Sequence, residues 1–382
     1  MAESTLAVAN SIAGVSGTVS ASPDTIRTVS GTKVQSDEGP EFNEILLRQK
    51  PDCVSLLTEL RSRLSESEIL YACSYPVAGE DESGFEEALK IVQDADVVIL
   101  TLGGKHGTCS IATMGEGVDA SSINLPPCQD AFIREAAKLN KPMIGVHLDG
   151  RPISSDTADA CLNAILEAWS PAECGAEAIT DTLLGKNNPA GRLPVSVPYH
   201  AGQIPIYYNH PNGSCWHQAQ SIGFQDYVDL PHKPRYCFGY GLSYTRFQYD
   251  HFTLSKPEIQ PDEALEISTE ITNVGAVAGD EVVQLYVSDC FASCTRPTQE
   301  LAGFCRVHIN AGETKLIRFT LMPDQLAFLD QDMRWKIEKG DFSVRIGASS
   351  EDIRAEASFR ITADAWIDGK TRSMIATAEV ES

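Results

Sequence analysis

Two stretches decide the fold of this chain: Asp96-Val-Val-Ile-Leu-Thr-Leu102 and Pro142-Met-Ile-Gly-Val-His-Leu148. Both are nearly continuous apolar runs, a pattern typical of strands that are buried on both faces. The surrounding sequence alternates further helix-like and strand-like runs, which lie at 53–64, 69–73, 84–93, 127–139, 164–169 and 176–184. This alternation predicts an α/β fold, with a mostly parallel sheet sandwiched by helices.

After residue 247 the pattern changes to short strands with alternating polar and apolar residues. Turn signals at Asn273-Val-Gly275 and Asn310-Ala-Gly312 separate some of them. About seven such strands before residue 362 predict an all-β domain, a β-sandwich of the immunoglobulin or fibronectin type III-like kind. The clearest strand signals lie at 265–271, 281–287, 303–309, 315–321 and 342–346.

The changes in composition divide the chain into five parts. We expect a weakly ordered N-terminal segment (1–50), an α/β sandwich domain (51–200), a connector rich in aromatic residues, Pro and Gly (201–246), the β-sandwich (247–362) and a loosely held tail (363–382). The connector is expected to pack across domains, because so many aromatic side chains would be costly to leave in water.

The charge balance excludes several classes of partner. The 382 residues include 30 basic and 53 acidic side chains, a net charge of −23, and no basic cluster that would attract nucleic acid or an anionic membrane. No apolar run approaches the length of a transmembrane helix, and the N-terminus lacks the basic start of a secretory signal, so we expect a cytoplasmic protein. The 11 cysteines form no C-x-x-C pair, which favours reduced structural thiols over a metal site at Cys290 and Cys294.

The segment from Gly103 to Pro126 is the first candidate for chemistry. Ligands of open parallel sheets bind beyond the carboxyl ends of strands, and a loop of this length inside a compact domain usually has a function. Glu116 lies between two glycines, so its carboxyl group is accessible and could act as general acid and then base. Lys105 and His106 could bind sugar hydroxyls or set the protonation of Glu116, or they could be plain surface residues.

Two other motifs give weaker signals. Gly103-Gly104 follows a strand but lacks the spacing of a phosphate-binding loop, so no nucleotide cofactor is expected. Ser154, Ser155 and Asp156 lie near His147 in the manner of a hydrolase triad, yet no G-x-S-x-G motif supports that interpretation. Capping of a helix by Ser155 or Asp156 explains these residues better.

A series of motifs resembles glycoside hydrolase family 3, the β-glucosidase and β-xylosidase group. Those that resemble its C-terminal α/β domain are Gly115-Glu-Gly-Val-Asp119, Leu125-Pro126 with Gln129, Gly150-Arg-Pro152, Ala164-Ile-Leu-Glu-Ala-Trp169 and Asn188-Pro-Ala-Gly-Arg-Leu-Pro194. Those that resemble its fibronectin type III-like domain include Phe238-Gly-Tyr-Gly-Leu-Ser-Tyr-Thr245, Gly279-Asp-Glu-Val-Val-Gln-Leu-Tyr286 and Glu300-Leu-Ala-Gly-Phe304. Together the motifs cover roughly residues 60 to 350 in the order of the family.

The resemblance implies a retaining double displacement on β-linked glucosides or xylosides. It places the general acid/base at Glu116, with Asp119 at the position of the Asp that usually follows. Together with Lys105 and His106 from the same loop, Asp119 is a candidate for substrate binding. The Arg that often follows this Asp is Ala120 here, so the hydrogen bonding of the family's loop cannot be assumed for this chain. No metal or other cofactor is implied.

The family's nucleophile is an Asp on a (β/α)8 barrel, which needs about 250 residues, and only some 60 residues precede the part of the chain that resembles the family. We therefore expect that the chain lacks the barrel and that activity needs one supplied by another polypeptide. The expected protein partner is a separate barrel subunit or a further copy of this chain in a homo-oligomer. Two alternatives stay open at this point: a non-catalytic module that binds carbohydrate or another protein, and a truncated product without activity.

Overall fold

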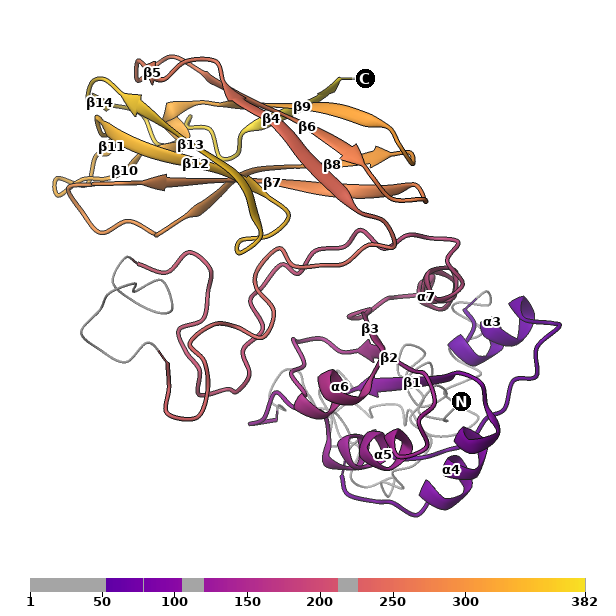
Figure 1. The fold of residues 1–382 in the computed structure, drawn as a ribbon. Coiled ribbons are helices and arrows are strands. Elements are labelled where there is room, and N and C mark those ends of the chain that lie inside the picture. The colour runs from indigo at the N-terminus through magenta and orange to yellow at the C-terminus, as the bar shows by residue number, and fades with distance from the viewer. Residues whose placement is uncertain (1–52, 78, 105–119, 212–225, 382) are drawn as a thin grey trace. The chain divides into compact units, whose positions relative to one another are not determined.

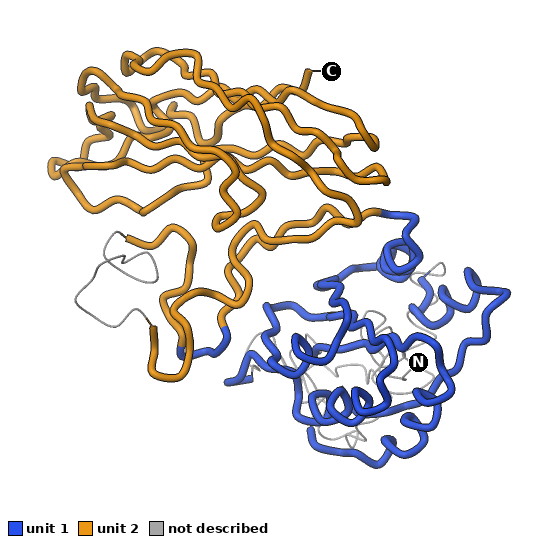
Figure 2. Tube along the Cα trace, in the orientation of Figure 1, with its two compact units in different colours: residues 1–187, 199–202 blue, residues 188–198, 203–382 orange. Residues whose placement is uncertain are grey.

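The computed structural model describes residues 53–77, 79–104, 120–211 and 226–381, and Figure 1 shows their helices and strands. The chain divides into two compact units (Figure 2). The first contains Met1–Asn187 and Tyr199–Gly202, and the second contains Asn188–Pro198 and Gln203–Ser382. Within the described ranges, no helix has the length and apolar character needed to cross a membrane.

The first unit is built on three parallel strands in the order β1-β2-β3: β1 (Val98–Gly103), β2 (Met143–Leu148) and β3 (Ala164–Glu167). Leu102 pairs with His147, which in turn pairs with Glu167. The carboxyl ends of all three strands therefore lie at one edge of the sheet. This arrangement confirms the parallel sheet that the apolar runs predict.

Helices cover both faces of this sheet. They are α3 (Leu56–Arg63), α4 (Phe85–Asp94), α5 (Pro127–Ala137), α6 (Asp156–Cys161) and α7 (Gly175–Leu183). Side chains of α4, α5 and α6 form one core cluster with Leu100 and Leu102, whereas α3 and α7 form another with Val146 and Leu148. The alternation of side chains along each strand produces these two cores, because neighbouring residues point to opposite faces.

Local sequence signals explain where several helices begin and end. Ser55 caps α3 by accepting a hydrogen bond from Thr58 N at 3.1 Å, Pro127 occupies the first turn of α5, and Gly185 adopts a φ of +72° just after α7. The strand expected at 69–73 does not form: only Ala72 makes a bridge in this part of the described chain. Its apolar side chains pack into the cores instead of extending the sheet.

The second unit contains a β-sandwich. Its strands are β4 (Phe247–Leu254), β5 (Glu258–Ile259), β6 (Leu265–Asn273), β7 (Gly279–Asp289), β8 (Glu300–Ile309), β9 (Thr314–Leu321), β10 (Phe328–Leu329), β11 (Trp335–Ile337), β12 (Gly340–Gly347), β13 (Ile353–Ile361), β14 (Ala365–Trp366) and β15 (Thr377–Glu381). A short 3₁₀ helix spans Pro323–Leu326. Five strands (β5-β13-β12-β7-β8) face four (β15-β9-β6-β4) across one core, and β10-β11-β14 form a small third sheet. The predicted sandwich is confirmed.

The structure differs from the expected loose tail after residue 362. β14 pairs with β11, and β15 pairs with β9 over five residues. Ala376 is 5% exposed and donates its N–H to Ala302 O at 2.7 Å. The tail is therefore anchored by backbone pairing at the edge of a sheet. Most of its side chains are exposed, so the sequence gives no sign of this anchoring.

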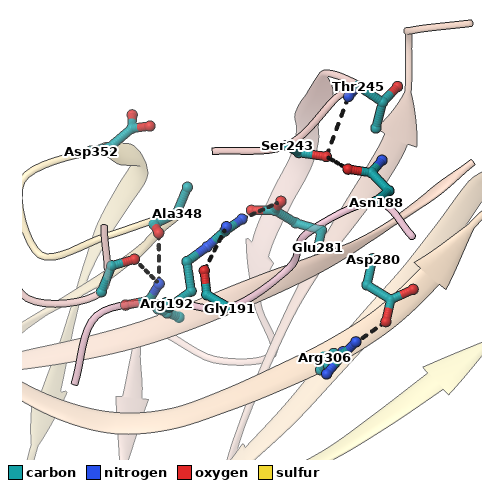
Figure 3. Close-up of polar contacts among 12 residues, drawn as sticks. Asn188, Gly191, Arg192, Ser243, Thr245, Asp280, Glu281, Arg306, Ala348 and Asp352 are labelled. Atoms are coloured by element: carbon teal, nitrogen blue, oxygen red, sulfur yellow. Dashed lines mark hydrogen bonds and ion pairs between the residues drawn. The ribbon is translucent and has the colours of Figure 1, made fainter. Parts of the chain in front are cut away.

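A buried ion pair fastens the segment before the connector to the sandwich (Figure 3). Arg192 Nη2 lies 2.9 Å from Glu281 Oε2, and the two side chains are 9% and 3% exposed. Tyr249 donates its hydroxyl to the other oxygen of Glu281 at 2.7 Å. Burial raises the pKa of Glu281, and the Arg192 guanidinium opposes that rise. The charge of Glu281 in the folded protein therefore depends on Arg192.

Asn188 adds neutral hydrogen bonds to the same attachment. Its side-chain oxygen accepts from Ser243 Oγ at 3.0 Å and from Tyr244 N at 2.8 Å, and its side-chain nitrogen donates to Ala278 O at 3.0 Å. The segment Asn188-Pro-Ala-Gly-Arg192 thus belongs structurally to the second unit.

We predict that Arg192→Ala lowers the free energy of unfolding of the second unit by about 3 kcal/mol, because it leaves a buried carboxylate without its cation. The matched control is Arg306→Ala, which removes an exposed partner of Asp280 (Figure 3) and should cost less than about 1 kcal/mol. Urea unfolding followed by hydrogen exchange measures both. Equal losses in the two variants would contradict this account of the ion pair.

Candidate functional site at the carboxyl edge of the parallel sheet

The residues predicted to act on substrate, Glu116, Lys105, His106 and Asp119, lie outside the described residues. The structure does describe both flanks of this segment, at Gly104 and at Ala120. It also describes the edge of the sheet at which the first flank begins, just after β1. The geometry of these flanks and of that edge is therefore what the structure contributes to the candidate site.

Gln129 holds the first flank. It is 1% exposed, accepts a hydrogen bond from Gly103 N at 2.9 Å and donates to Gly103 O at 2.8 Å and to Val77 O at 3.0 Å. Gly103 has a φ of +123°, and a Cβ atom there would lie 2.2 Å from Leu148 O. Only glycine fits this close approach, so the chain leaves β1 in one defined direction.

Arg151 holds the second flank. Its Nη2 donates to Ser122 O at 2.9 Å, and its Nη1 donates to Ala120 O at 3.4 Å. Arg151 belongs to the turn that follows β2, so the segment returns to the same sheet edge from which it departed. Position 120, where the family often has Arg, is thus held through its backbone oxygen.

Asp149 is a buried carboxyl group directly after β2. It is 6% exposed and accepts hydrogen bonds from Gly150 N at 2.7 Å and Arg151 N at 3.3 Å. Burial raises its pKa from 3.8 to about 6, against the opposing effects of the Gly150 N–H and the Arg151 charge. The charge of Glu167 adds to the rise. This group therefore changes charge near neutral pH.

His147 and Glu167 form a pair on neighbouring strands. His147 is 4% exposed, and its Nδ1 lies 3.3 Å from Glu167 Oε2. Its Nε2 is buried without a hydrogen-bond partner among the described residues. Glu167 Oε1 accepts from Trp169 N at 3.2 Å, and Trp169 has a φ of 51°, a conformation that a bulky residue adopts only under constraint.

The hydrolase triad that would join His147 to Ser154, Ser155 or Asp156 does not form. His147 pairs with Glu167, while Ser155 caps α6 by accepting from Ala158 N at 3.0 Å. The capping interpretation of Ser155 is confirmed. In the described part of the chain, no group of three or more His, Cys, Asp or Glu side chains could hold a metal ion.

Comparisons with known proteins identify the family of this chain. The family model described as "Glycosyl hydrolase family 3 C-terminal domain" matches residues 4–244, and a fibronectin type III-like model matches residues 281–350. The chain belongs to glycosyl hydrolase family 3. The β-sandwich is accordingly its fibronectin type III-like domain, as the motifs predict.

Relatives within family 3 are considerably longer than this chain. A beta-xylosidase of Formosa agariphila is 35% identical over 79% of the chain and 40% of the relative, and a periplasmic beta-glucosidase of Salmonella typhimurium is 36% identical over 72% and 36%. A crystal structure of a Listeria innocua beta-glucosidase in complex with gluconolactone matches with a TM-score of 0.74 and 30% identity, covering 82% of this chain and 42% of that one. The chain thus spans about 40% of the length of its relatives.

Sequence reasoning missed the roles of Asp149, Glu167 and Gln129. Gln129 and Glu167 stand inside family 3 motifs, but their hydrogen bonds depend on contacts with distant residues. Asp149 and Glu167 could have been found as candidates, because each stands at or just after the carboxyl end of a parallel strand. The burial that alters the pKa of Asp149 has no signal in the sequence.

We predict that Asp149 makes the first unit less stable as the pH rises. An acid whose pKa is higher in the folded than in the unfolded protein holds its proton more tightly when folded, so this contribution to stability disappears between pH 3.8 and about 6. The loss is up to about 3 kcal/mol. Asp149→Asn should remove it, whereas Asp96→Asn, a change at an exposed residue, should not. Urea unfolding at pH 4.5 and pH 7.5 measures the difference, and parallel pH profiles for all three proteins would contradict it.

We also predict that Gln129→Leu lowers the free energy of unfolding of the first unit by about 3 kcal/mol, because it leaves buried backbone groups of Gly103 and Val77 unpaired. Hydrogen exchange at the Gly103 amide should accelerate in the same variant. Gln93→Leu, at an exposed position of α4, is the control. Unchanged exchange at Gly103 would show that Gln129 does not hold this flank.

Proposed function

We propose that this chain is the C-terminal part of a retaining β-glycosidase that hydrolyses β-glucosides or β-xylosides. Glu116 acts as the general acid/base, and the Asp nucleophile lies on a (β/α)8 barrel that a longer protein or a second polypeptide supplies. The observation that carries the proposal is the match to the family 3 domain over residues 4–244. The relatives named above as a xylosidase and a glucosidase support this class of substrate.

The described residues have a definite part in this mechanism. A retaining enzyme protonates the leaving oxygen and later deprotonates a water molecule, and both steps need the acid/base within about 0.5 Å of its working position. Gln129 fixes the flank before the Glu116 segment, and Arg151 fixes the flank after it. They act as positioning residues, while Lys105, His106 and Asp119 contact the sugar hydroxyls.

A neutral sugar suits a chain with a net charge of −23, since it needs no cation for binding. The proposed reaction uses no metal and no organic cofactor. A location in the cytoplasm, a separate barrel subunit and a homo-oligomer stay predictions.

Fusing this chain behind the barrel part of the Formosa agariphila relative tests the proposal. We predict hydrolysis of an aryl β-glucoside or an aryl β-xyloside, and a fall in kcat of about 10²- to 10⁴-fold in Glu116→Gln. The basic limb of the pH profile should disappear in this variant, because a neutral amide cannot donate a titrating proton. Azide should restore turnover in Glu116→Gln and yield a β-glycosyl azide, because azide needs no general base.

Glu87→Gln is the matched control, because it makes the same change at an exposed position of α4. Its kcat and pH profile should equal those of the parent fusion. A Glu116→Gln fusion with the activity and pH profile of the parent would contradict the assigned role. A folded fusion that hydrolyses neither substrate would contradict the function itself.

A non-catalytic binding module is the second candidate, and one observation favours it. Tyr207 is 50% exposed and lines a hollow in the connector, where an aromatic ring could contact a sugar. Of the other connector aromatics, Tyr208 stacks on Phe238 and Tyr240 on Tyr236, while Trp216 lies outside the described residues. Calorimetric titration of the unfused chain with glucose, xylose and short oligosaccharides separates the two, since millimolar or tighter binding favours the module.

A further inference from the structure

The stretch from Val195 to Tyr244, which includes most of the connector, carries an unusual share of the exposed apolar side chains. Seven of the nineteen large hydrophobic residues exposed in the described ranges lie between 195 and 244, a stretch that holds about an eighth of the described residues. They are Val195, Ile204, Tyr207, Tyr227, Val228, Leu242 and Tyr244. Exposed apolar side chains mark a site of interaction where they gather in one patch.

Three of the seven, Val195, Ile204 and Tyr207, come together in a hollow of about 670 Å³, which is lined by residues 194–196, residues 204–209 and Phe238. We call it the Ile204–Tyr207 hollow after two of its exposed lining residues, whose side chains are 69% and 50% exposed. None of its lining residues is Asp, Glu, Lys, Arg or His. Ser196 Oγ is buried there without a hydrogen-bond partner among the described residues. The lining therefore suits an uncharged and mainly apolar occupant, which could also offer one polar group to Ser196 Oγ.

The hollow rests on a firmly held base. Gln203 donates to Pro231 O at 2.6 Å and to Lys233 O at 2.9 Å, and His210 O accepts from Thr298 N at 2.9 Å. Between these two points, Tyr208 stacks on Phe238 with ring centroids 4.2 Å apart and accepts a hydrogen bond from Leu301 N at 3.2 Å. The exposure of Ile204 and Tyr207 is thus fixed by the hydrogen bonds and ring stacking of the residues beside them.

The character of the walls favours a protein segment over a sugar. Carbohydrate sites combine aromatic faces with several polar groups, whereas Ile204, Val195 and two prolines contribute aliphatic surface to this hollow. Exposed Ile and Tyr on a rigid base are suited to receive an apolar anchor residue of a partner. The chain also spans only about 40% of its relatives, and the matched part is their C-terminal 40%. More than half of each relative therefore has no counterpart in this chain, and that part is the candidate partner.

We propose that the Ile204–Tyr207 hollow is the docking site for the barrel-bearing part of the enzyme, which inserts an uncharged apolar segment between Ile204 and Tyr207. This inference rests on the proposed function, since it names the partner that the function requires. One hollow is too small for a stable interface of about 1,200 Å² or more, so it acts as the central anchor of a wider contact.

The experiment titrates the 382-residue chain with the separately produced barrel part of the Formosa agariphila relative and measures heat. The test variant is Ile204→Ser with Tyr207→Ser. Both side chains are at least half exposed, so the fold should persist, and circular dichroism verifies this. Phe291→Ser is the matched control, because Phe291 is 86% exposed but belongs to the sandwich. The sedimentation of each chain alone is measured alongside.

We expect the double variant to bind the barrel part at least tenfold more weakly than the parent, while Phe291→Ser binds as the parent does. Equal binding by the double variant would overturn the proposal, as would absence of binding by the parent chain. A parent dimer that the double variant converts to a monomer would also overturn it, because the hollow would then join two copies.

The fused enzyme described above keeps this test separate from the test of function. Its two parts are covalently joined, so its turnover does not depend on strong docking. If the fusion is active but the double variant binds the barrel part as tightly as the parent chain does, only the docking site is contradicted. An inactive, folded fusion contradicts the function.

Discussion

The parallel pairing of β1, β2 and β3 is the constraint on which the candidate site depends. Because Leu102, His147 and Glu167 stand in register, the residues that follow each strand meet at one edge of the sheet. Gly103, Asp149 and Trp169 come together there although they are far apart in sequence. A slip of register by one residue would bury or displace these groups together.

Hydrogen bonds to backbone groups then hold the two described flanks of the segment that contains Glu116. Gln129 satisfies both backbone groups of Gly103, and Arg151 satisfies the oxygens of Ala120 and Ser122. In the second unit, the buried pair of Arg192 and Glu281 likewise fastens the segment before the connector to the sandwich. Both units thus use buried polar contacts at positions where the chain leaves regular structure.

The sequence predicted the regular elements well, because their signals are local. The runs at 96–102 and 142–148 became β1 and β2, and the turn at Asn310-Ala-Gly312 separates β8 from β9. The edge strands β4 and β15 were missed. A register shift between Asp250 and Thr253 interrupts the alternation of β4, β15 is only five residues long, and both strands depend on pairing with β6 and β9. The burial of Asp149 and the strained backbone of Trp169 depend on tertiary contacts, which no local pattern reveals.

The most direct test of the account is a crystal structure of the fused enzyme with gluconolactone bound. The measurement is the distance between the Glu116 carboxyl group and the nearest Asp carboxyl group of the barrel. The account predicts about 5 to 5.5 Å, with the lactone between the two groups, as a retaining mechanism requires. A separation above about 6.5 Å, or a Glu116 that does not face the lactone, would contradict it.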